Sequence, residues 1–110
     1  LEQTIDQGIG VMIRSGMVNT NLAQCGIDTT RADELVMQGK IQVLAVQNKS
    51  RGNDGDGTRA SLSEFRTTLK ALRDTYRGVL VNEDLPLATS QGVLSVAQSL
   101  DVTAARIGTL

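Results

Sequence analysis

Apolar residues recur at alternating spacings of three and four between Ala60 and Gly78, where the hydrophobic pattern of this chain is most regular. This spacing predicts an α-helix with one apolar face. Ser61 and Glu64 stand three positions apart and fit a capping box near its start, and Gly78 fits a helix end. The residues expected to pack from this face against the rest of the domain are Leu62, Phe65, Leu69, Leu72 and Tyr76.

A row of basic residues runs beside this apolar face on the same helix. Its members are spaced four, three and four apart, so they form a second stripe. Such a row is either a solvated edge whose long stems cover the core, or a surface that pairs with acidic residues of a neighbouring helix or with phosphates. This candidate partner-binding row consists of Arg66, Lys70, Arg73 and Arg77.

Weaker helical patterns precede this segment. Leu1–Gly16 carries apolar residues on one side and predicts a helix, which Gly8 and Gly10 weaken while leaving room for another helix to approach. One of the threonines at 29–30 is expected to cap a second helix. Its continuation through 40–47 is ambiguous, because the β-branched residues there also fit a strand. We favour the helix, since the chain offers no obvious partner strand except Val79–Val81.

Loop and turn signals divide the remainder of the chain. Segment 48–59 has three glycines and no apolar residue, which indicates a loop, and segment 17–28 is expected to be a connector. Pro86 ends the connection after the central helix, and a hydroxyl residue at 89–90 is expected to cap a further helix. Asp101 is expected to cap the last segment. We therefore predict an all-α fold, a compact bundle of four or five short helices.

Composition supports a helical core. The only aromatic residues are Phe65 and Tyr76, so the core must be built from aliphatic side chains, which suits helix packing better than a β-sandwich. A length of 110 residues fits a single domain spanning 1–110. Because the chain begins with Leu1 and not Met, it is interpreted as a processed product or an excised domain.

Charge is distributed unevenly, although the formal net charge is only −1. Residues 29–78 hold nine of the eleven basic residues and six acidic ones, whereas 1–28 and 79–110 each carry three acidic residues and one arginine. The ends of the chain are therefore expected to attract its middle, within a subunit or between subunits. A net charge this small argues against a nucleic-acid protein that depends on bulk charge.

Side-chain chemistry argues against several function classes. The chain has no His and a single cysteine, Cys25, which leaves no imidazole base and too few ligands for a zinc site. Cys25 is expected to be buried, which weakly favours a reducing compartment such as the cytoplasm. No phosphate-binding loop, nucleophile elbow or membrane-spanning stretch is present. We predict a protein that is not an enzyme and uses no cofactor.

The acidic residues before the central helix resemble part of a calcium-binding EF-hand loop. Asp54, Asp56 and Gly57 match its central D-x-D-G pattern, but the first ligand position then falls on Gly52 and the last on Ser63. Neither residue has a carboxylate. A calcium-responsive module is kept as a weak alternative, and no metal ligands are assigned.

The C-terminal segment Val93–Leu110 resembles a helix-turn-helix pattern at the level of a motif. Ala97 would be the small residue at the helix crossing, and Asp101 takes the place of the usual turn glycine. Thr103 and Arg106 would then face a DNA groove as candidate DNA-binding residues. Similar apolar spacing also arises in αα-hairpins that do not bind DNA.

Taken as a sequence, the chain favours a non-enzymatic interaction or self-assembly module, either a homo-oligomer or the partner of another protein. A helix-turn-helix DNA-binding domain is the alternative. In the favoured hypothesis the basic row selects the partner. Reversing the charges of Arg66 and Arg73 is then expected to weaken assembly without unfolding the subunit.

Overall fold

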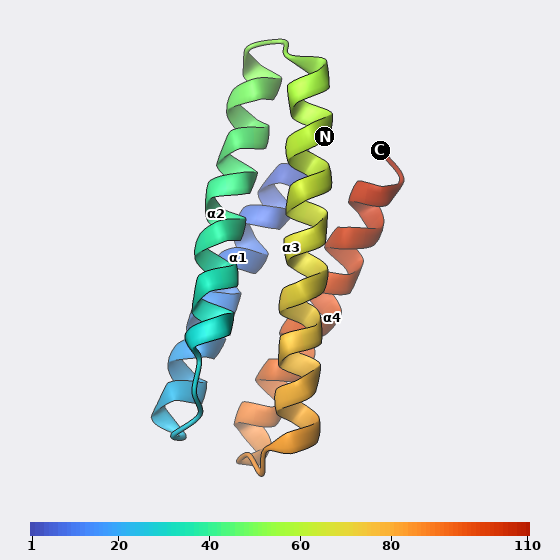
Figure 1. The fold of residues 1–110 in the computed structure, drawn as a ribbon. Helices are drawn as coiled ribbons and strands as arrows, with labels where there is room; N and C mark the ends of the chain where they lie inside the picture. Colours follow the sequence, from blue (N-terminus) through green and yellow to red (C-terminus); the bar gives the residue numbers. More distant parts are fainter.

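The computed structural model describes residues 1–110 and contains four antiparallel helices and no strand (Figure 1). Each helix packs against the next one in the sequence, and α4 closes the bundle by packing on α1. The predicted all-α fold is therefore confirmed. The helices are 22 to 28 residues long. They are α1 (Glu2–Gln24), α2 (Thr30–Arg51), α3 (Gly55–Asn82) and α4 (Leu87–Gly108).

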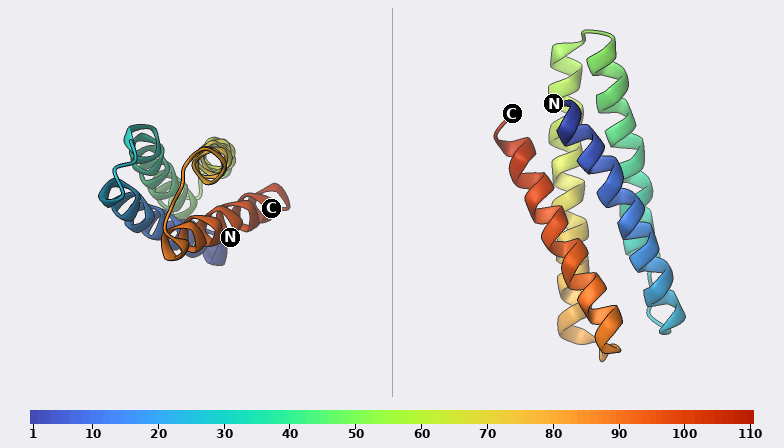
Figure 2. Two further views of the ribbon diagram at one scale, coloured as in Figure 1. Left: turned by 90° about the horizontal axis from the view of Figure 1, so that it is seen from below. Right: turned by 180° about the vertical axis from the view of Figure 1, so that it is seen from behind.

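The bundle is elongated, with extents of 46 × 22 × 17 Å. The hairpin of α2 and α3 projects beyond the start of α1 and the end of α4 (Figures 1 and 2). Both chain termini lie close together beside α3, where Leu1 and Leu110 line the same cleft. The projecting tip therefore contains α2 and α3 alone. All contacts that involve α1 or α4 lie in the rest of the bundle.

Helix α3 starts earlier than the sequence pattern suggested. Its N-terminal cap is Asp54, whose carboxylate accepts a hydrogen bond of 2.9 Å from the backbone N–H three residues on. Ser61 lies inside the helix, and its buried hydroxyl accepts a hydrogen bond from Lys49 Nζ at 2.9 Å. The predicted capping box at Ser61 was therefore wrong, because an aspartate further upstream supplies the cap. The helix also continues through Gly78 to Asn82.

The predicted loop at 48–59 shrinks to 52–54. Asn53 makes this turn with a φ of 57°, a left-handed conformation that asparagine tolerates better than most residues. The polar residues on either side continue α2 and begin α3 at the projecting tip. This segment lacks apolar residues because the helix ends at the tip are exposed and have no core to contact. The polar composition therefore indicated an exposed corner between two helices and not a long loop.

The helix continuation through 40–47 is confirmed, since α2 runs to Arg51. The connector expected at 17–28 was wrong in its first part, because α1 extends to Gln24 and buries Asn19 and Leu22. The cap expected at 89–90 was also wrong. Helix α4 begins directly after Pro86, whose fixed φ suits the position before a helix.

Twenty buried hydrophobic side chains from all four helices form one core. The ring of Phe65 lies between α1 and α2, close to two helical glycines. A Cβ atom at Gly8 would lie 2.7 Å from Phe65 Cε2, and one at Gly39 would lie 2.5 Å from Met12 Sδ. The glycines therefore leave the space that the ring and the methionine fill. Gly10, in contrast, has no neighbouring atom within 4 Å of the corresponding position.

Candidate interaction surface

The packing residues expected on the central helix all face inward. Phe65, Leu69, Leu72 and Tyr76 are no more than 1% exposed, and Leu62 is 8% exposed. They belong to the core shared by the four helices. Their side chains hold the bundle together and are not available to a partner.

The basic row is largely occupied by α4 of the same chain. Arg73 donates to Asp101 Oδ1 at 2.7 Å and to Asp74 at 3.0 Å, and Arg77 pairs with the other oxygen of Asp101. These hydrogen bonds, chiefly the one to Asp101, raise the pKa of Arg73 further above its usual range. The attraction expected between the middle and the ends of the chain therefore occurs within the subunit, between α3 and α4.

Arg66 also contacts α4. Its Nε atom donates to the backbone carbonyl of Ala104 at 3.1 Å, and its guanidinium lies against Gly108, where a Cβ would come within 2.9 Å. A positive charge is favourable at this helix C-terminus, whose last carbonyls lack helical partners. Lys70 is half-buried and has no ion pair. Reversing Arg66 and Arg73 would place acids against these α4 groups, so that double variant would loosen the fold as well as any assembly.

The expected helix-turn-helix does not form. Helix α4 is continuous through Asp101, which is held by two arginines and does not cap a new helix. Thr103 is fully buried, and its hydroxyl donates to the carbonyl of Ser99 at 2.8 Å. Arg106 is exposed, but it donates to Gln7 on α1. The prediction of Thr103 and Arg106 on a common groove-facing surface was therefore wrong, because the apolar spacing belongs to one long helix.

The acidic residues of the EF-hand-like segment are engaged locally. Asp54 caps α3, and Asp56 pairs with Arg59 one turn further on. No group of three or more acidic or cysteine side chains is placed to hold a metal ion. Cys25, expected in the core, is exposed at the end of α1, with its sulfur 3.9 Å from the Thr89 hydroxyl. The prediction that Cys25 is buried was wrong, because α1 ends there and its last residues lie outside the core.

A polar network that sequence reasoning missed crosses three helices inside the bundle. The Tyr76 hydroxyl lies 2.6 Å from Asn19 Oδ1 and 3.1 Å from the carbonyl of Ser15. The Asn19 amide in turn donates to Asp33 at 3.0 Å, and Thr29 donates to the same carboxylate. A tyrosine on an otherwise apolar helix face was the available signal, since a buried hydroxyl requires a partner. Sequence spacing alone does not identify that partner.

Tyr76 provides a pH test of this burial. Burial raises the pKa of the Tyr76 phenol well above its usual value of about 10. Above pH 10 the unfolded chain loses the Tyr76 proton and the folded chain keeps it, so the contribution of Tyr76 to stability is constant below pH 10 and falls as the pH rises further. Because Tyr76 is the only tyrosine and no tryptophan is present, tyrosinate absorbance reports this one group.

We expect tyrosinate absorbance and loss of helical circular dichroism to develop together during an alkaline titration. The denatured chain is the control and should titrate near pH 10. Ionisation near pH 10 with the helical signal intact would contradict the buried position of the hydroxyl.

The clearest unoccupied surface lies on α1 and α2, which run side by side (Figures 1 and 2). Large apolar side chains at helical spacing stay exposed on both helices, each between 50% and 67%. A groove runs between the two helices. Its lining includes Ile9, Met12, Lys40 and Val43. We call this surface the α1–α2 face and define it by Ile13, Met37, Ile41 and Leu44.

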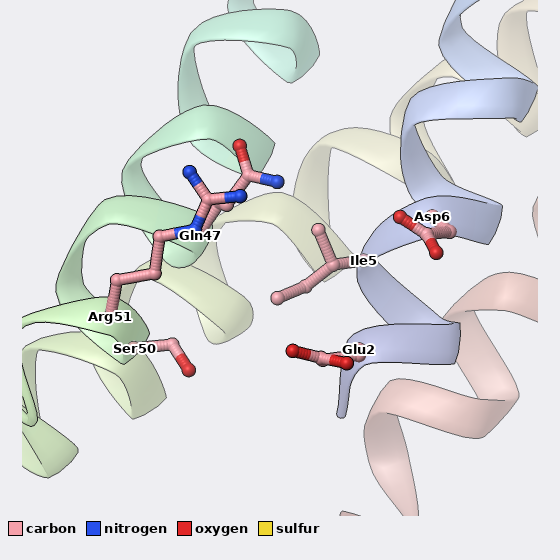
Figure 3. Close-up of a pocket in the computed structure, with 6 residues that line it drawn as sticks. All are labelled: Glu2, Ile5, Asp6, Gln47, Ser50 and Arg51. Carbon is pink, nitrogen blue, oxygen red and sulfur yellow. The ribbon is translucent and has the colours of Figure 1, made fainter.

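Charged residues stand at one end of the same face. A neighbouring hollow between α1 and α2 is lined by Glu2 and Asp6 on α1 and by Arg51 on α2 (Figure 3). Neither carboxylate forms an ion pair within 4 Å. Lys40 lines the apolar groove and is also unpaired. The α1–α2 face therefore combines an apolar centre with unpaired charges of both signs.

The fold and this surface define the chain as a four-helix bundle with an exposed apolar face. None of its helices combines the length and apolar character that crossing a membrane requires. Comparisons of the chain with protein-family models, with curated proteins and with solved structures found no match. The geometry of the surface is therefore the basis for a functional proposal.

Proposed function

We propose that this protein is a non-enzymatic self-assembly module whose copies associate through the α1–α2 face. The observation that carries the proposal is the set of four large apolar side chains left at least half exposed on two neighbouring helices. Burying apolar surface contributes about 25 cal/mol per Å². A second copy offers the same apolar face, and such self-matching surfaces form symmetric dimers.

The basic row is not used in this proposal. Three of its four members hold α4 within the subunit, as the contacts of Arg66, Arg73 and Arg77 indicate. The α1–α2 face has no comparable internal partner. Contact through this face would leave the ion pairs between α3 and α4 in place.

A pair of substitutions tests the proposal. We expect the wild-type chain to show a molar mass above 11.7 kDa by light scattering, falling only on strong dilution. Met37→Glu with Ile41→Glu should give a monomer, because it places two charges in the centre of the apolar contact. Both side chains are exposed, so the subunit should keep its helical circular dichroism.

The matched control places the same charges elsewhere. Leu94 and Val102 on α4 are 48% and 47% exposed and lie outside the α1–α2 face. Leu94→Glu with Val102→Glu should associate like the wild type. A wild-type monomer at every concentration, or equal loss of mass in both double variants, would contradict assembly through this face.

A further inference from the structure

Two opposite charged edges border the α1–α2 face. On α1 the acidic edge consists of Glu2 and Asp6, and on α2 the basic edge is Arg51, which lines the same hollow. All three side chains are exposed, and none forms an ion pair within 4 Å. In Figure 3, Glu2 and Asp6 lie on one side of the hollow, and Arg51 lies on the other.

The antiparallel packing of α1 and α2 places these edges at corresponding heights. The start of α1 lies beside the end of α2, because Ile5 and Asp6 line the same hollow as Gln47 and Arg51. Further along, Met12 lies next to Gly39. The apolar residues Ile13 on α1 and Met37 on α2 therefore occupy the middle of the face, beyond the charged end.

We infer that the partner on this face is a second copy related by a twofold axis parallel to the helices, so that the acidic edge of each copy meets the basic edge of the other. This inference rests on the proposed self-assembly. Such an axis lays α1 of one copy over α2 of the other and keeps equal heights together. This charge contact is then made twice, once on each side of the axis, and the apolar parts of α1 and α2 meet beyond it.

The other symmetric arrangement offers less complementarity. An axis across the helices would lay α1 over α1 and α2 over α2 in opposite directions. The acidic edge would then face residues 15–24 of the partner's α1, a segment that contains no charged residue. Arg51 would face the start of the partner's α2, where Asp33 and Glu34 already have partners in their own chain. Charge therefore favours the axis parallel to the helices.

Charge reversal tests the arrangement. Glu2→Lys with Asp6→Lys puts bases opposite Arg51 in both contacts. We expect the dimer dissociation constant, measured by sedimentation or light scattering, to rise by about tenfold or more. Adding Arg51→Glu to the same chain should restore most of the lost affinity.

The outcomes separate this inference from the proposed function. A wild-type monomer overturns both. A wild-type dimer that keeps its affinity in the acid-reversed variant, or whose affinity is not restored in the triple variant, overturns the parallel axis alone. Reversal of Glu2 also removes a favourable charge from the first turn of α1, so helical circular dichroism is measured for each variant. Because the triple variant carries the same α1 substitutions, restored affinity excludes misfolding as the cause of the loss.

Discussion

Replacement of Phe65 by alanine is expected to lower the free energy of unfolding by about 3–5 kcal/mol. The ring is 1% exposed and lies where α1, α2 and α3 meet, between Gly8 and Gly39. Gly8 and Gly39 beside the ring carry no side chain that could fill the space left by its removal. Chemical denaturation followed by circular dichroism measures the change. A loss below about 1 kcal/mol would contradict this central position.

Gly8→Ala should test the close contact between α1 and the Phe65 ring by lowering the free energy of unfolding. The new Cβ would lie 2.7 Å from a ring carbon, and relieving such overpacking costs about 1–3 kcal/mol. Alanine favours the helix by up to about 1 kcal/mol, which offsets only part of that cost. In a Phe65→Ala chain the collision is removed, so the same substitution should be neutral or stabilising. The two substitutions are therefore expected to be strongly non-additive.

Gly10→Ala is the matched control on the same helix. No atom lies within 4 Å of its new Cβ, so only the helix preference acts, and stability should rise by up to about 1 kcal/mol. Opposite signs for the variants at positions 8 and 10 would support the close approach at Gly8. Equal effects would contradict it.

Tyr76→Phe is expected to lower the free energy of unfolding by about 1–3 kcal/mol. The ring remains, but Asn19 Oδ1 loses the hydroxyl that lies 2.6 Å away in the core. Asn19 is only 3% exposed, so water does not readily replace the donor. Denaturation of the variant against the wild type measures the change.

A double-mutant cycle with Asn19→Ala isolates the hydrogen bond. When the acceptor is already absent, Tyr76→Phe should cost much less, because the remaining contact is with the carbonyl of Ser15. Thr75→Val offers a comparison, since the Thr75 hydroxyl only donates to a carbonyl of its own helix. Full additivity in the cycle would contradict a hydrogen bond between Tyr76 and Asn19.

The proposed interaction surface was not the surface that the charge pattern indicated. Arg73 and Arg77 form a regular stripe in the sequence, but their partner Asp101 is more than twenty positions away along the chain. The exposed residues Met37 and Ile41 look like core residues in the same sequence. A side chain's spacing specifies its side of a helix, whereas neighbouring helices decide whether that side is covered.

The sequence by itself determined the all-α fold and the inward face of α3, because the three-and-four spacing from Leu62 to Tyr76 admits one helical face and each of those side chains is buried. The sequence left 40–47 open between helix and strand, because its β-branched residues fit both, and the bundle showed it to be helical. The positions of the helix ends were poorly determined by the sequence, because several nearby residues could each cap a helix. At the start of α3 the cap is Asp54 and not Ser61.

Only the tertiary structure decided which polar groups meet. Asn19, Asp33 and Tyr76 come from three helices and form one network. Likewise, only packing showed that the basic row is largely occupied by α4, while α1 and α2 retain an exposed apolar face. Local periodicity sets the direction in which a side chain points from the axis of its helix. Its burial and pairing depend on residues that are distant in sequence and close in space.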